Sequence, residues 1–211
     1  MRAYYFTSLA HGLSNIALQR LKISRVHELN DPYELFAADL SEETLRTPYE
    51  SMRAQLAKTR GMLCFSKSWE KPLMWSHYAD RHRGVCLGCD IPDDAVFEVR
   101  YSEERVPFTR ELLSHKDPEE WMKRYLGTKH AAWAEEREVR VICDLDPATV
   151  EDGLFFYELD DRIALREVIL GVRCSLPKAR VERLTEQMGA SVSVRTTQLS
   201  NSAFAVLAAE T

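Results

Sequence analysis

Hydrophobic and polar residues alternate with a period of two in many short segments of the chain, a pattern typical of β-strands. The sequence predicts strands at residues 2–6, 21–26, 61–66, 84–90, 95–101, 154–157, 167–172, 191–196 and 203–207. A further strand is predicted in the second half of residues 133–143. Residues 84–90 and 95–101 flank a turn at Pro92, Asp93 and Asp94, so we expect these two strands to pair with each other.

Apolar residues spaced three or four apart predict the helices. Leu9, Leu13 and Ile16 define the first helix, and Thr7 or Ser8 can cap its start. Further helices are expected at residues 42–60, with a break near Pro48, at 72–80, from Asp117 towards Trp133, and at 175–188, ended by Gly189. Strands outnumber helices. We therefore predict an α+β protein, with residues 1–211 forming one domain around a mostly antiparallel sheet and flanking helices.

Composition narrows the functional classes only slightly. The chain has 211 residues, 45% of them hydrophobic and 29% charged, and a net charge of −5. This balance argues against non-specific coating of nucleic acid, although a local basic groove stays possible. Five cysteines scattered through apolar runs suit buried, reduced thiols. Residues 1–6 lack the apolar core of a signal peptide, and no run approaches the length of a membrane span, so we expect a cytoplasmic protein without membrane association.

The most unusual chemistry lies in residues 136–143. If this segment is a strand throughout, Glu136, Glu138 and Arg140 share one face. One interpretation is an edge strand whose charged face lies in water. The other is a site in which one carboxylate acts and Arg140 holds it or a substrate anion. The pattern alone leaves both open, and a register error of one residue would move each side chain to the other face.

Two further segments carry candidate ligand contacts. Pro32 fixes the turn at residues 30–34, where we favour an Asp31 side chain that bonds its own backbone over one that binds a ligand. Asn30 and Glu34 stay open between these roles. Trp75 and Tyr78 fall within one helical turn and can stack on an aromatic ligand, although core packing is the more common role for such a tryptophan.

The sequence lacks the motifs of several metal sites and enzyme classes. Cys86 and Cys89 have a zinc-like spacing, but no second cysteine pair accompanies them, so we predict no metal site. The sequence contains no phosphate-binding loop, no dinucleotide fingerprint, no Gly-x-Ser-x-Gly elbow and no His-Glu-x-x-His helix. Kinases, dinucleotide oxidoreductases, serine hydrolases and zinc proteases are therefore disfavoured.

Four pieces of sequence occur in a recognisable order. They are an aromatic first strand running into Thr7-Ser8, then Asn30-Asp31-Pro32-x-Glu34, then Trp75-x-x-Tyr78 before residues 84–88, and finally Trp133-x-x-Glu136-x-Glu138-x-Arg140. The later Ile169-Leu170-Gly171 also fits. Together they resemble the bacterial domain-of-unknown-function family 2971 over essentially the whole chain. That family has no settled activity, and it distantly resembles ADP-ribosyltransferases, which cleave NAD on a split antiparallel sheet.

The resemblance implies roles for particular residues. Glu138 would stabilise the oxocarbenium-like transition state and Glu136 would orient the acceptor. NAD or a related nucleotide would be bound by Tyr5, Asn30, Ser66, Trp75, Tyr78 and Arg140. Tyr5 departs from the family pattern, because relatives often carry His at this position. No metal is implied.

The resulting function hypothesis is transfer of ADP-ribose from NAD to a protein or nucleic acid. The alternative is a non-catalytic module that recognises a nucleotide or a protein in a bacterial defence system, such as phage defence, or in a toxin-related system. The substitution at Tyr5 favours this alternative. A nucleic-acid-processing enzyme is a third hypothesis, and it would require a local basic groove.

Overall fold

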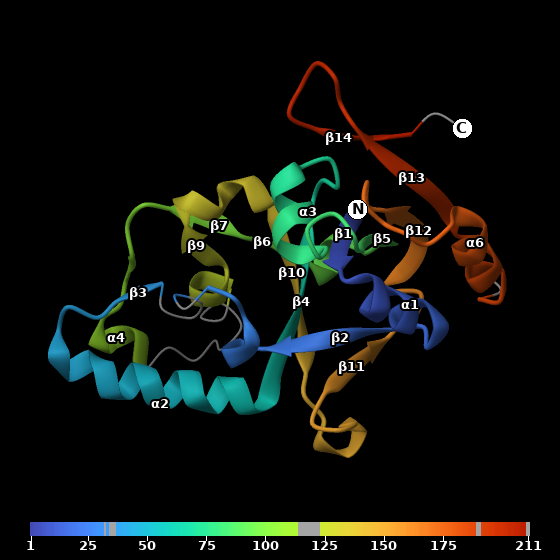
Figure 1. Cartoon of the computed structure of the whole chain (residues 1–211). Helices are drawn as coiled ribbons and strands as arrows, with labels where there is room; N and C mark the ends of the chain where they lie inside the picture. Colours follow the sequence, from blue (N-terminus) through green and yellow to red (C-terminus); the bar gives the residue numbers. More distant parts are fainter. Residues whose placement is uncertain (32, 34–36, 114–122, 189–190, 210–211) are drawn as a thin grey trace.

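The structure, a computed structural model, describes residues 1–31, 33, 37–113, 123–188 and 191–209. Ten strands of this described part of the chain form the central sheet (Figure 1). The main path of the sheet runs β11 (Phe155–Glu158), β2 (Arg20–Arg25), β4 (Arg60–Ser66), β1 (Arg2–Thr7), β5 (Val85–Asp90), β12 (Ala164–Leu170), β13 (Ser193–Leu199) and β14 (Val206–Ala208). Two more strands lie off this path: β10 (Glu138–Asp144) pairs with β4, and β6 (Phe97–Glu98) pairs with β10.

Most neighbouring strands of this sheet are antiparallel, as predicted. The exception among the described pairs is β12 with β13, which run parallel on either side of helix α6 in the chain. Two small parallel sheets lie beside the main one: β3 (Ala38–Asp39) with β8 (Val106–Pro107), and β7 (Arg100–Ser102) with β9 (Thr128–His130). The architecture is therefore α+β.

The sheet divides at β4. One edge of β4 is occupied along its whole length, because β10 pairs with residues 60–66. β1 and β2 must therefore share the opposite edge. β2 pairs with β4 only at Gly61 and Met62, whereas β1 pairs with it at Ser66. Between these two contacts β1 and β2 separate, and the direction of β2 crosses that of β4 (Figure 1). The sheet is consequently split at this point.

Helices cover both faces of the sheet and one end. In the largest core cluster, Ile16 of α1 and Val181 of α6 pack with strand residues such as Leu87 and Val139. On the opposite face, Trp75 of α3 packs with residues of β1, β5 and β12. α2 lies away from α6 and forms a separate cluster through aromatic side chains (Figure 1). The described helices are α1 (Leu9–Ala17), α2 (Glu43–Thr59), α3 (Pro72–Tyr78), α4 (Arg110–Leu113) and α6 (Lys178–Glu186), with short 3-10 helices η1 (Val26–Glu28), η2 (Asp93–Ala95), η3 (Ala131–Glu136) and η4 (Pro147–Thr149).

Local signals predicted the start of the first helix correctly. Ser8 caps α1 by accepting the backbone N–H of His11. The break predicted near Pro48 is wrong, since α2 continues through this residue. Leu45 and Tyr49 are both buried on the packed face of α2, and their burial outweighs the hydrogen bond that proline cannot make. The helix predicted from Asp117 and the stop at Gly189 fall on residues outside the described part of the chain.

The predicted hairpin between residues 84–90 and 95–101 is also wrong. β5 pairs with β1 and β12 instead, and β6 pairs with β10. Val85 to Cys89 are buried on both faces of the sheet, which is the environment of a central strand with two long neighbours. The turn residues at 92–94 permit a hairpin, but burial of both strand faces decides the partners.

Candidate functional site

Four charged side chains lie together in the interior. Glu136, Glu138, Lys129 and Arg140 have exposed fractions of 3%, 7%, 6% and 0%. Charged residues are seldom buried this deeply unless they are paired. The interpretation of an edge strand with its charged face in water is therefore wrong. We call these four residues the buried charge cluster.

Arg140 binds both carboxylate oxygens of Glu138. Both residues lie on one face of β10, as the alternation predicted, while Val139 between them packs in the large core. Arg140 Nε donates to Glu138 Oε1 at 2.7 Å and Nη2 donates to Oε2 at 2.9 Å. A third donor, Nη1, bonds the carbonyl of Leu126 at 2.6 Å. Arg140 thus positions the Glu138 carboxylate.

Glu136 also belongs to the buried charge cluster, although it does not lie in β10. It ends the 3-10 helix η3, and Arg137 then adopts a left-handed backbone with φ of 47° before β10 begins at Glu138. The expectation that Glu136 belongs to the strand is therefore corrected. Lys129 of β9 joins the two carboxylates: its Nζ lies 2.7 Å from Glu136 Oε2 and 3.6 Å from Glu138 Oε2.

A chain of hydrogen bonds continues from Glu136 to the surface. The hydroxyl of Tyr78, at the end of α3, donates to Glu136 Oε1 in a short hydrogen bond. The side-chain amide of Asn30 donates to the same hydroxyl at 2.9 Å. Asn30 precedes the turn in which Asp31 accepts the backbone N–H of Tyr33 at 2.9 Å, which confirms the predicted self-bonding role of Asp31. Glu34 lies outside the described residues.

The pKa values of the two carboxyl groups shift in opposite directions. Burial raises the pKa of Glu136, and Lys129 only partly opposes this effect. Burial acts on Glu138 as well, but the ion pair with Arg140 outweighs it and lowers the pKa of Glu138 below its usual value. Glu138 is therefore held as an anion, whereas Glu136 is the carboxyl group that takes up a proton more readily.

Both carboxylates line a cavity of about 280 Å³ at the split of the sheet, which we call the carboxylate pocket. Its walls come from β1, β2, β4, η1, α3, β9, η3 and β10. Asn30, Tyr78, Lys129, Glu136 and Glu138 all contribute to this lining. Segments that are far apart in the sequence thus meet around a pair of buried acids.

The first strand presents a different tyrosine from the one expected. Tyr4 is the register partner of Ser66 on β4, and Ser66 is in turn the partner of Glu138 on β10. Tyr4 therefore shares the face of Glu138. Tyr5 contributes to the pocket lining, but its ring packs edge-on against Phe65, 5.8 Å between centroids, in the core of the opposite face. Burial raises the pKa of Tyr5.

Three other predicted ligand contacts have structural partners and are absent from the described lining of the pocket. Ser66 is fully buried, and its hydroxyl donates to the carbonyl of Glu136 at 2.7 Å. The indole N–H of Trp75 donates to the carbonyl of Trp69 at 2.6 Å, and its ring packs edge-on against Phe6. Arg140 contacts the Glu138 carboxylate on the side away from the cavity. These residues support the site from outside the cavity.

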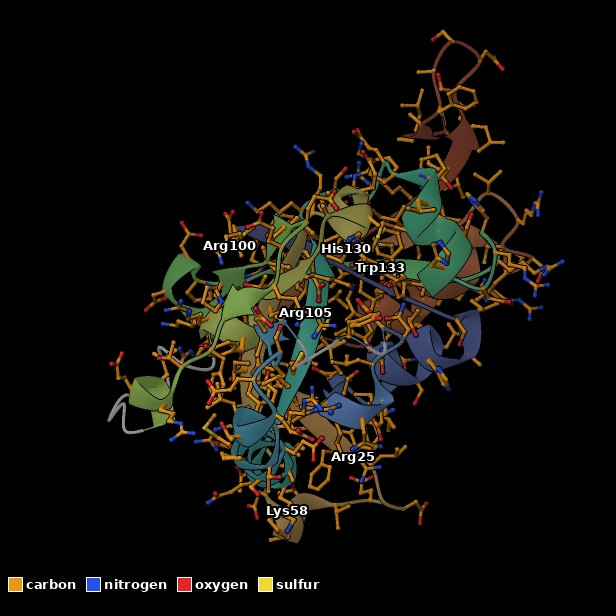
Figure 2. The ribbon with its side chains drawn as sticks, turned by 90° about the vertical axis from the view of Figure 1, so that its left-hand side faces the viewer. Arg25, Lys58, Arg100, Arg105, His130 and Trp133 are labelled. Atoms are coloured by element: carbon orange, nitrogen blue, oxygen red, sulfur yellow. The ribbon has the colours of Figure 1, made fainter. Side chains whose placement is uncertain are left out.

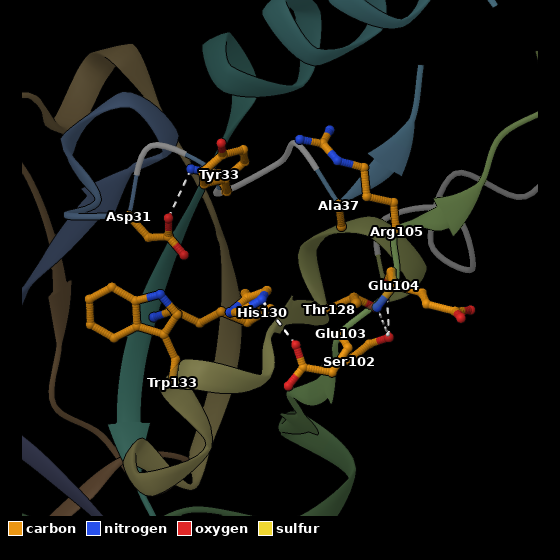
Figure 3. A pocket seen from close by; sticks show the side chains of 11 residues that line it. Asp31, Tyr33, Ala37, Ser102, Glu103, Glu104, Arg105, Thr128, His130 and Trp133 are labelled. Atoms are coloured by element: carbon orange, nitrogen blue, oxygen red, sulfur yellow. Dashed lines mark hydrogen bonds and ion pairs between the residues drawn. The ribbon is translucent and has the colours of Figure 1, made fainter. Parts of the chain in front are cut away.

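A larger cavity of about 540 Å³ lies on the other side of Lys129, which lines both spaces. Its described walls include Asp31, Tyr33, Arg105, His130 and Trp133 (Figure 3). We call it the aromatic cavity. None of the sequence patterns pointed to this space as a whole, because its walls come from several short segments without periodicity.

Sequence reasoning also missed Lys129 and Tyr4. A single lysine in a polar segment resembles any surface lysine, and only its 4% side-chain exposure distinguishes it. Tyr101 was missed too: its hydroxyl accepts the backbone N–H of Glu138 at 2.8 Å. The signal for Tyr4 was present in the aromatic first strand, but the choice between adjacent tyrosines depends on register.

Cys86 and Cys89 lie on opposite faces of β5, in two different core clusters, so they cannot bind one metal ion together. Within the described residues, no group of three or more His, Cys, Asp or Glu side chains is arranged to hold a metal ion. No helix in the same residues is both long and apolar enough to cross a bilayer.

The matched part of the chain contains the buried charge cluster. Residues 74–141 match a family described as "Protein of unknown function (DUF2971)". The DUF2971 match runs from α3 into β10 and includes Tyr78, Lys129, Glu136, Glu138 and Arg140, whereas Tyr4 and Asn30 precede it. No curated protein and no solved structure matches the chain. The resemblance to ADP-ribosyltransferases therefore stays a prediction.

Proposed function

We propose that the carboxylate pocket binds NAD or a related nucleotide and transfers ADP-ribose to a protein or nucleic-acid acceptor. The observation that carries this proposal is the convergence of Glu136 and Glu138 on one cavity at a split in the sheet. The opposite directions of their pKa shifts divide the acid–base roles between them.

In this proposal Glu138 acts as a fixed negative charge near the ribose. Cleavage of the bond between ribose C1′ and the nicotinamide nitrogen leaves the electron pair on nicotinamide, and positive charge develops on the ribose. The Glu138 carboxylate, held by Arg140, stabilises that charge without having to reorient. Glu136 accepts the proton of the acceptor group as its nucleophilic atom bonds to C1′.

The size of the pocket limits what it can enclose. A cavity of about 280 Å³ falls at the lower end of the range for small-molecule sites, roughly 300–1,000 Å³. This volume suits a nicotinamide riboside unit better than a whole dinucleotide. The remainder of NAD would extend out of the pocket.

A non-catalytic recognition module is the second candidate. Two cations, Lys129 and Arg140, face two carboxylates in the buried charge cluster, so their formal charges cancel. Such a cluster can fix the shape of a binding pocket without contributing a net charge to a reaction. The first strand also presents tyrosines where the family resemblance suggests a histidine.

Calorimetry with NAD and with ADP-ribose, followed by mass spectrometry for released nicotinamide, tests both candidates. Transferase activity predicts release that is lost in Glu138→Gln. The matched control is Glu135→Gln, because Glu135 has a 63% exposed side chain that pairs with Lys71 and does not line the pocket. Circular dichroism would verify that each variant is folded.

The outcomes separate the candidates. Release that depends on Glu138 but not on Glu135 supports the transferase. Binding without release, weakened by Glu138→Gln, supports the recognition module. If the folded wild-type protein neither binds these ligands nor releases nicotinamide, the nucleotide proposal is wrong in both forms.

A further inference from the structure

The aromatic cavity is a second space with its own walls, and it is partly open to solvent. Figure 3 shows Tyr33 and Arg105 on one side of it, and Trp133, His130 and Ser102 on the opposite side. Its volume of about 540 Å³ lies well within the range of small-molecule sites. It is therefore large enough for a ligand of nucleotide size.

Aromatic rings on opposite walls suit a flat ligand. Tyr33 lines the cavity and is 59% exposed. Trp133 is held in place by Lys129, whose Nζ lies 4.6 Å from the centre of its ring system. His130, beside Trp133, accepts the backbone N–H of Ala132 and pairs with Glu103. The cavity therefore offers a planar heterocycle an aromatic side chain on each of two opposite walls.

The charged groups of the cavity are not equivalent. Lys129 is bound to the two carboxylates of the neighbouring pocket, Glu103 is paired with His130, and Asp31 accepts the backbone N–H of Tyr33. The carboxylate of Glu104 points away from the cavity in Figure 3. Arg105 lies at the mouth, 5.3 Å from the centre of the Tyr33 ring, and donates to the carbonyl of Ala38 at 3.2 Å. Its planar guanidinium has five N–H donors and suits a phosphate.

Further basic side chains lie on the same side of the molecule as this cavity. Figure 2 shows Arg25, Lys58, Arg100 and Arg105 on the same side of the molecule as Trp133, and Arg25 is paired there with Glu28. Of these residues, Arg105 lines the cavity, and its positive charge attracts an anionic ligand even when the net charge of the chain is −5.

We propose that the aromatic cavity is a binding site for a purine nucleotide, with the base between Tyr33 and Trp133 and the phosphate at Arg105. The nucleotide is either a free molecule or a residue of single-stranded RNA, because both present the same stacked base and phosphate. The site is separate from the carboxylate pocket, and the proposal does not require that pocket to bind NAD. Lys129 forms the wall between the two.

Titration of the full chain with AMP, adenosine, inorganic phosphate and a short oligoadenylate tests this site. Tyr33→Ala is expected to weaken AMP binding about tenfold, since a stacked base loses roughly that much affinity when its aromatic partner is removed. Tyr33→Phe keeps the ring and should bind as the wild type does. Arg105→Gln should weaken AMP about tenfold and leave adenosine unchanged.

Arg110→Gln is the matched control, because Arg110 is exposed, pairs with Glu42 and does not line the cavity. Fluorescence of Trp133 reports on occupancy, and loss of the AMP-dependent signal in Trp133→Phe would assign that signal to the cavity. Comparison of AMP with oligoadenylate identifies which source binds more tightly, and either result supports the site.

The proposal is overturned if AMP and oligoadenylate both fail to bind at millimolar concentration, or if binding is indifferent to Tyr33→Ala and Arg105→Gln. AMP binding that responds to Glu138→Gln but not to Tyr33→Ala would place the ligand in the carboxylate pocket and would also overturn it. Absence of nicotinamide release would contradict only the proposed transferase activity of the carboxylate pocket. It would not affect the conclusion drawn from AMP binding about the aromatic cavity.

Discussion

Replacing Lys129 with Met tests the buried charge cluster directly. Methionine has a similar volume but no charge, so Lys129→Met removes the cation that contacts both carboxylates. The distance from Nζ to Glu136 is 2.7 Å, which corresponds to about 6 kcal/mol of Coulomb attraction at an effective dielectric constant of about 20. The variant no longer has to bury an ammonium group, which offsets part of this loss. Breaking a buried pair by removing one partner typically costs about 3–5 kcal/mol.

The expected destabilisation depends on pH. Without Lys129, the folded protein can avoid a buried unpaired charge by protonating Glu136, so the pKa of Glu136 rises further than in the wild type. A carboxyl whose pKa is raised by folding binds a proton more readily in the folded state. Its favourable contribution is complete below the unfolded pKa, near 4.5, and is lost as the pH rises through the folded value. Protonation costs about 1.4 kcal/mol per pH unit above that unfolded value.

We therefore expect Lys129→Met to lower the free energy of unfolding by about 3–5 kcal/mol at pH 8 and by about 1–2 kcal/mol at pH 5.5. Urea denaturation at both pH values measures this difference. Lys71→Met is the control, because Lys71 pairs with Glu135 at 2.8 Å on the surface, and exposed pairs contribute about 0–1 kcal/mol.

The double variant Lys129→Met with Glu136→Gln removes the unpaired charge and should recover much of the lost stability at pH 8. A destabilisation below about 1 kcal/mol at pH 8, or an equal loss at both pH values, would refute the reasoning. Either result would mean that the cluster is not closed to solvent in the folded protein.

Three further variants probe other parts of the molecule. Tyr78→Phe removes the donor to Glu136; we expect about 1 kcal/mol lower stability by urea denaturation and a further rise in the pKa of Glu136, measured by NMR titration. Gly88→Ala places a Cβ against the side chain of buried Glu167, closer than van der Waals contact, and an unchanged melting temperature would contradict the expected loss of about 1–3 kcal/mol. Phe204 is fully exposed, so Phe204→Ser should alter the free energy of unfolding by no more than about 0.5 kcal/mol in the same assay.

Structural features that depend only on residues close together in the sequence were predictable. The alternation from Glu138 to Cys143 identified the two faces of β10, because strand geometry alone sends successive side chains to opposite sides. The capping role of Ser8 and the self-bonding turn at Asp31 followed for the same reason, since each involves a backbone N–H two or three residues away.

Features that depend on burial were predicted less well. Pro48 suggested a helix break, but packing of Tyr49 against Phe108 and Tyr125 keeps α2 continuous. The turn near Pro92 suggested a hairpin, but β5 is enclosed between β1 and β12. In both places a local preference is outweighed by the larger free energy of burying apolar side chains.

The sequence by itself determined an α+β chain rich in antiparallel strands, together with a pair of acids and an arginine at fixed spacing. Only the tertiary structure decided that these charges are buried, that Lys129 joins them and that Tyr4 rather than Tyr5 shares their face. Spacing along one strand follows from covalent geometry, so it can be read from sequence. The meeting of β9, β10, α3 and the first strand depends on long-range register, and a shift of one residue would turn each of these side chains away from the pocket.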